Sequence, residues 1–405
     1  MINPVEFKTL STQVEEHLFH HYLPFWCGPA LDREQGGWMG WLTNDLQPDR
    51  SQPKGLIVNA RIVWAFSAVY HVRPEPLYRE MAARAFNFVM NKFWDVEHGG
   101  AFWRLTDAGQ VLDDSKKIYG QAFYIYALAE FHRAFGGHAA LPRARQLFEL
   151  IEQHAHDAKF GGYIEVCNRD WSAAGAEARL SDKDLNEKKS MNNHLHVLEA
   201  YTNLYGVWPE PRVAARLREL IELFLTRILD PRTKHLNHFF NEPWEIRSDT
   251  YTFGHDIEAS WLLCEAAEAL GDQPLLTRVR AVAVEMAEVT LREGLADAGG
   301  LQYEGRAGQI IDPGRECWPQ AEALVGFLNA YELSHNPVFF SAAAQTWKFI
   351  GEHLVDRVHG EWFWRILPDG QPDPKLPKVS EWKGPYHATR ACLESLRRLS
   401  HFSPR

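Results

Sequence analysis

Cysteine is scarce in this sequence and follows no recognisable pattern. The 405 residues include only five cysteines, an odd number, and no two form a CxxC pair. This excludes a disulfide framework and a cysteine-based zinc site, and it is typical of a reducing compartment. The N-terminal residues also lack the basic and apolar regions of a signal peptide. We therefore expect a cytoplasmic protein.

Long hydrophobic runs and an excess of positive charge are also lacking. No run of about 18 apolar residues occurs, so no membrane span is expected. Acidic residues outnumber basic ones, and the formal net charge of −10 argues against nucleic acid or an anionic membrane as partner. No linker or low-complexity segment interrupts the chain. Residues 1–405 are therefore predicted to form a single domain.

Aromatic residues, in contrast, are abundant, at 13% of the chain with 15 tryptophans. Such rings form large core layers or platforms for flat ligands such as sugars. Short aromatic segments, most of them with glycine, recur six times, about every 60 to 74 residues, and predict a tight turn into a short strand. These segments are residues 36–41, 99–104, 161–165, 234–240, 299–303 and 359–364.

An apolar helix, and then in most repeats an amphipathic one, is predicted after each segment. The apolar helices are predicted at 56–70, 120–135, 191–205, 253–270, 318–333 and 387–399. The amphipathic ones are predicted at 77–94, 141–154, 212–229, 274–292 and 338–355, with 4–22 as the sixth. The alternation predicts an all-α fold, an (α/α)6 barrel with short β-hairpins between helix pairs. An open solenoid is the alternative.

Polar and aromatic residues stand at the start of every apolar helix. Because parallel inner helices begin at the same end of a barrel, these residues are expected to converge on one pocket. The charged insert at 169–189 is expected to overhang a mouth of the barrel. The converging residues include Asn59, Arg61, Tyr119, Gln121, Asn192, His194, His196, His255, Glu258, Trp318, Gln320, Glu322, Trp382, Tyr386, His387 and Arg390.

Several kinds of chemistry are compatible with such a pocket. His194 and His196 are two residues apart and project differently, unlike the spacing of a metal-binding helix pair. No GxSxG nucleophile motif occurs. Glycoside hydrolysis by Glu258 and Glu322 stays open, as does sugar binding without catalysis. Neutral histidines also suit proton abstraction next to a carbonyl, with Arg61 stabilising the enediolate.

Six motifs resemble those of a known family. The stretch MNNHLHVLEAYTNLY at 191–205 closely resembles a segment of the cellobiose 2-epimerases, which belong to the N-acylglucosamine 2-epimerase superfamily. The resemblance continues in NARI at 59–62, IYGQAF at 118–123, GHDIEASWLL at 254–263, WPQAE at 318–322 and EWKGPYH at 381–387. It implies an (α/α)6 barrel and catalysis without metal or redox cofactor.

The resemblance also implies roles for individual residues. His255 and His387 match two acid/base histidines, which remove and return the C2 proton through a cis-enediolate. Arg61 and His194 match residues around O1 and O2, and Glu258 matches a carboxylate that orients the histidine chemistry. Sugar-contacting residues are expected to be Tyr119, Asn192, Trp318, Glu322 and Trp382.

Three positions depart from the family pattern. Asn193 stands where a threonine is expected, and Pro319 and Gly384 border the pocket. Because they border the pocket, these departures bear on the length of the sugar substrate and not on the type of reaction. We predict a 2-epimerase that interconverts glucose and mannose configuration in a cellobiose- or mannobiose-type disaccharide or in the free monosaccharide. An aldose–ketose isomerase is the alternative, and a monomer or weak homodimer is expected.

Overall fold

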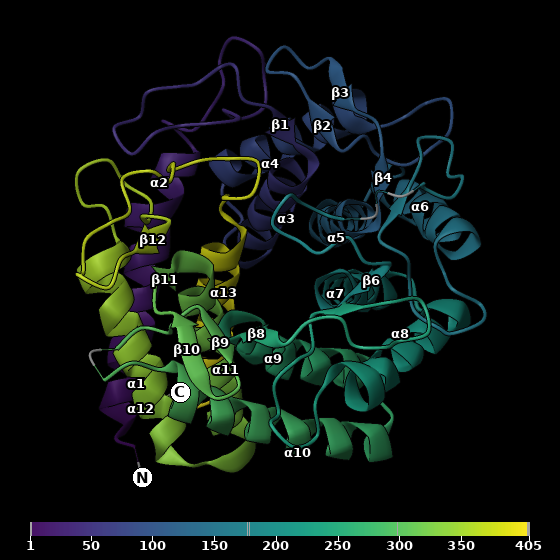
Figure 1. Ribbon diagram of the computed structural model, residues 1–405. Coiled ribbons are helices and arrows are strands. Elements are labelled where there is room, and N and C mark those ends of the chain that lie inside the picture. The colour runs from purple at the N-terminus through teal and green to yellow at the C-terminus, as the bar shows by residue number, and fades with distance from the viewer. Residues whose placement is uncertain (1, 176, 178, 298, 403–405) are drawn as a thin grey trace.

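Six helices form a closed inner ring in the computed structural model, which describes residues 2–175, 177, 179–297 and 299–402 (Figure 1). Each inner helix packs against the next, and the last packs against the first. They are α3 (Leu56–Val72), α5 (Ile118–Phe135), α7 (Met191–Val207), α9 (Phe253–Leu270), α11 (Cys317–Ser334) and α13 (Tyr386–Ser400). The predicted apolar helices are therefore present. Nearly every side chain in their first turns is buried, as their apolar sequence predicts.

A second set of helices packs against the outside of this ring. They are α1 (Pro4–Glu16), α4 (Pro76–Phe88), α6 (Ala140–His154), α8 (Pro211–Leu223), α10 (Gln273–Val289) and α12 (Pro337–Phe349), with the short α2 (Leu23–Trp26) after α1. Helix α1 packs on α13, so the first and the last described helices lie on the same side of the ring (Figure 1). None of the described helices is long and apolar enough to cross a membrane.

Five of the outer helices end in a turn of π-helix, where the sequence predicts continuous α-helix. These turns are η1 (His17–Tyr22), η2 (Val89–Phe93), η3 (Phe224–Ile228), η4 (Thr290–Gly294) and η5 (Ile350–Leu354). After four of them the next residue is already extended, as in Trp94 with φ −74° and ψ 125°. The wider turn therefore ends the helix and directs the chain into the aromatic segment.

Each aromatic segment begins with a tight turn closed by one antiparallel bridge, such as Trp94 with Ala101. Five of the turns contain glycine at positive φ, where other residues are strained. The fourth repeat has no glycine there, and Lys234 adopts φ 65° instead. The predicted turns are therefore confirmed.

Short antiparallel strands connect successive repeats. The strand before an inner helix pairs with the strand that follows the next turn. The order is β1-β2-β3, β4-β5, β6-β7, β10-β9-β8 and β11-β12, and a bridge between Leu42 and Val379 joins the last repeat to the first. The strands are β1 (Lys54–Gly55), β2 (Arg104–Leu105), β3 (Val111–Asp113), β4 (Lys116–Lys117), β5 (Val166–Cys167), β6 (Lys189–Ser190), β7 (Phe239–Phe240), β8 (Thr250–Thr252), β9 (Glu304–Arg306), β10 (Gln309–Asp312), β11 (Arg315–Glu316) and β12 (Arg365–Ile366).

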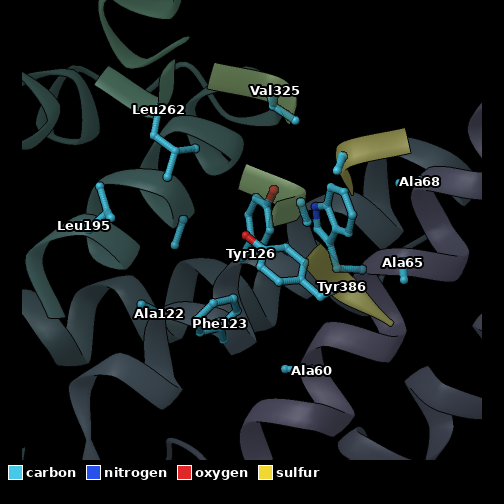
Figure 2. Packing of buried hydrophobic residues seen from close by; sticks show 14 of the residues in the cluster. Ala60, Ala65, Ala68, Ala122, Phe123, Tyr126, Leu195, Leu262, Val325 and Tyr386 are labelled. Carbon is cyan, nitrogen blue, oxygen red and sulfur yellow. The ribbon is translucent and has the colours of Figure 1, made fainter. Parts of the chain in front are cut away.

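Aromatic side chains fill the centre of the inner ring. The rings of Tyr126 and Tyr386 meet edge to face at 6.0 Å, and Phe123 contacts both (Figure 2). Trp64 packs against Tyr386 at 5.2 Å. This layer excludes water from one side of the polar groups described next, which strengthens their electrostatic interactions.

Candidate active site

A cavity of about 410 Å³ lies where the inner helices begin, a volume suited to a small molecule. All six inner helices contribute side chains to its wall, as the convergence of their first turns predicts. The lining side chains from these helices include Arg61, Tyr119, Asn192, His196, His255, Glu258, Trp318 and His387.

The charged insert supplies part of the wall. Residues 180–184 line the cavity, and the carbonyl of Leu180 accepts a 2.7 Å hydrogen bond from Lys117 Nζ. Residues 180–184 of the insert therefore lie at the cavity as predicted, and residues 176 and 178 of the same insert lie outside the described part. Trp382, from the loop before α13, also lines the cavity.

His255 and His387 face this cavity with comparable geometry. Nδ1 of His255 lies 2.5 Å from Thr252 Oγ1, and Nδ1 of His387 lies 2.6 Å from Glu322 Oε1. Nε2 is thus the ring nitrogen that each histidine has available for a ligand. The indole of Trp318 lies beside both imidazoles, with ring centroids 4.7 Å and 5.6 Å away.

The surroundings keep both imidazoles neutral. Burial lowers the pKa of His255 well below its ordinary value, and the neighbouring His238 lowers it further. Burial also lowers the pKa of His387, assisted by the positive charges of Arg61 and Arg390. A neutral imidazole has a free lone pair, so each histidine is ready to accept a proton near pH 7.

Arg61 is a buried cation that pairs with no carboxylate of the described residues. Its Nη2 donates to the hydroxyl of Tyr119 at 3.0 Å, and its Nη1 donates to the carbonyl of Trp382 at 3.1 Å. Its guanidinium also lies 4.4 Å from the centre of the Phe123 ring. Within the described ranges no carboxylate comes within ion-pair distance of it. A positive charge left free at a cavity wall suits a ligand that becomes negative.

Arg390 has the opposite environment, because three glutamates share its guanidinium. It donates to Glu199, to Glu258 at 2.5 Å and to Glu322 at 2.7 Å. One cation cannot neutralise three buried carboxylates. Burial and the charge of Glu322 accordingly raise the pKa of Glu258 to about 7, although Arg390 opposes the shift. Glu258 Oε2 has no hydrogen-bond partner among the described side chains.

The cluster also contains a set of potential metal ligands. Donor atoms of Glu258, Glu322 and His387 lie within 4.8 Å of one another. The Arg390 guanidinium, however, already bonds to both of these carboxylates. It supplies the positive charge that a metal ion would bring.

We therefore expect chelators to leave the activity intact. Incubation with excess EDTA, followed by removal of the chelator, should change kcat and KM by less than experimental error. Loss of activity that added divalent metal restores would instead assign these three side chains to a metal ion. Metal analysis of the purified protein gives an independent check.

Most of the predicted site residues line the cavity, but Glu322 does not. Tyr119, Asn192, Trp318 and Trp382 line the cavity. Glu322 is fully buried behind His387, where it accepts from Trp261 Nε1 at 3.2 Å. Its carboxylate contacts Nδ1 of His387 and does not line the cavity.

His194 does not line the cavity either. Its Nε2 accepts from the backbone N–H of Tyr163 at 2.8 Å, and its Nδ1 lies 2.6 Å from the carbonyl of Ser190. A Cβ at Gly162 would lie 2.5 Å from its Nε2, so glycine is required there. His194 thus fixes the turn of the third repeat, and the structure does not bring it into the cavity.

His196 occupies the place predicted for His194. Its Nδ1 bonds to Glu199 at 2.9 Å, and its ring packs edge to face on Tyr119 at 4.9 Å. His196 is among the residues expected to converge, and helical spacing favours it over His194. Asn192, His196 and Glu199 stand at i, i+4 and i+7 on one face, whereas residue 194 points elsewhere.

Comparison with known proteins agrees with this geometry. Residues 37–391 match the N-acylglucosamine 2-epimerase (GlcNAc 2-epimerase) family. The chain belongs to this family. It is 42% identical over 390 residues to a cellobiose 2-epimerase from Bacteroides fragilis, covering 96% of this chain and 99% of that one. The predicted resemblance is thereby confirmed, and the protein is a carbohydrate epimerase, an isomerase.

Two further relatives differ in how similar they are to this chain. The solved structure of a cellobiose 2-epimerase from Bacillus thermoamylovorans superimposes with a TM-score of 0.91 at 38% identity, covering 96% of this chain and all of that one. A D-mannose isomerase from Marinomonas mediterranea is 23% identical over 410 residues, covering 96% and 98% of the two chains.

Proposed function

We propose that this epimerase inverts C2 of a glucose or mannose unit at the reducing end of a free sugar, within a single (α/α)6-barrel domain. The observation that carries the proposal is that two neutral histidines share one cavity with a cation, Arg61, for which the described part of the chain offers no counter-ion. Such a site can remove a proton next to a carbonyl and stabilise the charge that results.

The reaction begins with the open-chain sugar, whose C1 carbonyl makes the C2 proton acidic. Nε2 of one histidine takes this proton, and the electron pair moves through C2–C1 to O1, which gives a cis-enediolate. Rotation about C2–C3 presents the opposite face of C2. The other histidine, His255 or His387 according to the direction, has taken a proton from solvent on Nε2 and gives it to C2, while the first histidine releases the proton that it removed to solvent.

The remaining groups stabilise the charges that appear during these steps. Arg61 stabilises the enediolate oxygens, and Tyr119, which accepts from Arg61, lies at the same wall. The ionised form of Glu258 favours the imidazolium that forms when a histidine accepts the proton. Trp318, beside both histidines, offers a flat surface for the sugar.

The relatives named cellobiose 2-epimerases favour a disaccharide substrate. The cavity extends beyond the histidines to Glu316, Trp364 and residues 181–184, which leaves room for a second sugar unit. Incubation with cellobiose, mannose and glucose, with product analysis by NMR, tests the proposal. A C2 epimer is the expected product, whereas a cleaved disaccharide or no reaction with any sugar would contradict it.

An aldose–ketose isomerase is the second candidate, because a D-mannose isomerase is among the relatives. Both reactions share the enediolate and differ in the carbon that receives the proton. Return to C2 gives the epimer, and return to C1 gives the ketose. A ketose as the main product in the same incubation would favour the isomerase.

The pH dependence of kcat/KM should report the ionisation of the Glu258 carboxyl group. Its pKa of about 7 lies above its ordinary value, whereas those of His255 and His387 lie below theirs. As pH falls through 7, Glu258 gains a proton while both histidines stay neutral, so kcat/KM should fall with a midpoint near pH 7. The residual activity of Glu258→Gln should lack this acid limb. An unchanged midpoint in that variant would assign the limb to another group.

A further inference from the structure

The imidazole of His255 is held from behind by a threonine and a second histidine. Its Nδ1 lies 2.5 Å from Oγ1 of Thr252, the last residue of β8. The same Oγ1 lies 3.5 Å from Nε2 of His238, to which the backbone N–H of Thr252 also donates at 3.2 Å. The rings of His238 and His255 stand edge to face, 5.7 Å apart.

Thr252 departs from the usual bonding at the start of a helix. It is the N-cap of α9, where a threonine hydroxyl ordinarily accepts from a backbone N–H in the first turn. No such bond forms here. The hydroxyl instead faces two imidazole nitrogens, and it has one proton to give.

The backbone fixes the acceptor end of this chain of hydrogen bonds. Because Nε2 of His238 accepts from the Thr252 N–H, this nitrogen carries no proton, and its lone pair, shared with that N–H, is the acceptor that the hydroxyl faces at 3.5 Å. The hydroxyl oxygen is then an acceptor for an N–H on Nδ1 of His255. The sequence of donors is therefore His255 Nδ1–H, Thr252 Oγ1–H and His238 Nε2.

We propose that Thr252 and His238 are positioning residues that keep the proton of neutral His255 on Nδ1 and so direct the lone pair of Nε2 to the sugar. The inference rests on the proposed role of His255 as an acid/base. When Nε2 takes the C2 proton, the imidazolium still donates from Nδ1 to Thr252. When Nε2 returns a proton, the same neutral tautomer is restored.

The surroundings of His238 keep it able to accept. Burial and the neighbouring charge of His235 lower the pKa of His238 to about 4, so it is neutral near pH 7. His387 has a different partner, the carboxylate of Glu322. In both histidines Nδ1 is hydrogen-bonded and Nε2 is directed to the cavity. The partner of His255 is a neutral chain of side chains, whereas the partner of His387 is a carboxylate.

The tautomer can be measured without any assay of activity. In protein labelled with ¹⁵N-histidine, the resonances lost in His255→Ala identify His255. The inference predicts a protonated Nδ1 and an unprotonated Nε2 at pH 7. In Thr252→Val a population with the proton on Nε2 should appear. A wild-type protein with the proton of His255 on Nε2 would overturn the inference.

Kinetics give the second test. Comparable partners of metal-bound histidines contribute roughly 10- to 100-fold, so Thr252→Val and His238→Met should lower kcat by about this factor with little change in KM. Thr252→Ser keeps the hydroxyl and His238→Gln keeps an acceptor, so both should retain most of the activity. Thr250→Val, two residues earlier in β8, is the matched control and should match wild type.

The role of His255 and the role of Thr252 and His238 can be tested separately. If His255→Ala keeps near-normal turnover, the proposed role of His255 is wrong. If His255→Ala is inactive while Thr252→Val and His238→Met match wild type, the proposed function stands and this inference is overturned. Equal losses in Thr252→Val and Thr252→Ser would also overturn it, because the hydroxyl would then not matter.

Discussion

Replacing either His255 or His387 with alanine is expected to abolish epimerisation in both directions. General acid–base groups contribute roughly 10²- to 10⁴-fold, and a two-base reaction needs both of them in every turnover. The measurement is kcat with each epimer as substrate, together with the melting temperature. His71→Ala is a suitable control, because His71 is exposed in the last turn of α3, at the end of the helix opposite the cavity.

Folding and catalysis can be separated in these variants. Both imidazoles lie at the cavity wall, so their removal should leave the fold intact. The melting temperature should stay close to that of wild type while turnover is lost. Near-normal turnover in either variant would remove that histidine from the mechanism.

The second large effect is expected at Arg61. An enediolate carries charge that the ground-state sugar lacks, so Arg61 should stabilise the transition state more than the substrate. Removing one such contact costs roughly 10²- to 10³-fold in kcat, so Arg61→Met should lower kcat by this factor with little change in KM. Arg61→Lys keeps the charge but loses the planar fork of donors, and it should recover only part of the activity.

Arg390 provides the contrast to Arg61. Because no carboxylate pairs with Arg61 in the described part of the chain, Arg61→Met leaves no unpaired buried anion and should keep the melting temperature. Arg390→Met leaves Glu199, Glu258 and Glu322 without their cation and should lower it strongly. If Arg61→Met lowers the melting temperature and leaves kcat of the folded enzyme unchanged, Arg61 is structural and lies outside the mechanism.

Much of the fold could be predicted because local patterns repeat. The predicted helix at 253–270 has the bounds of α9. Glycine, apolar periodicity and burial all indicate the same helix there. The π-turns were not predicted, because the apolar spacing of Val89 and Phe93 fits an α-helix as well. The pairing of strands from neighbouring repeats could not be predicted either, because each strand is only two to four residues long.

The sequence predicts which helix starts meet at the site, but it does not predict the individual contacts between their side chains. Convergence of six helix starts correctly brought Arg61, His255 and His387 to one cavity. Both His194 and His196 were expected to converge, and the resemblance assigned the role to His194, but only His196 lines the cavity because the two side chains project from different faces of the helix. The sharing of Arg390 by three glutamates joins residues from four helices, and no local pattern predicts it.

Exchange of the C2 proton with solvent tests the central claim most directly. In D2O the wild-type enzyme should place deuterium at C2 of both epimers, because each histidine acquires its proton from solvent between turnovers. His255→Ala and His387→Ala each retain one base. Each variant should therefore exchange C2–H of one epimer without epimerising it, and the two variants should act on opposite epimers. Exchange of both epimers by a single-histidine variant, or epimerisation by wild type with the original C2 hydrogen wholly retained, would contradict the two-histidine mechanism.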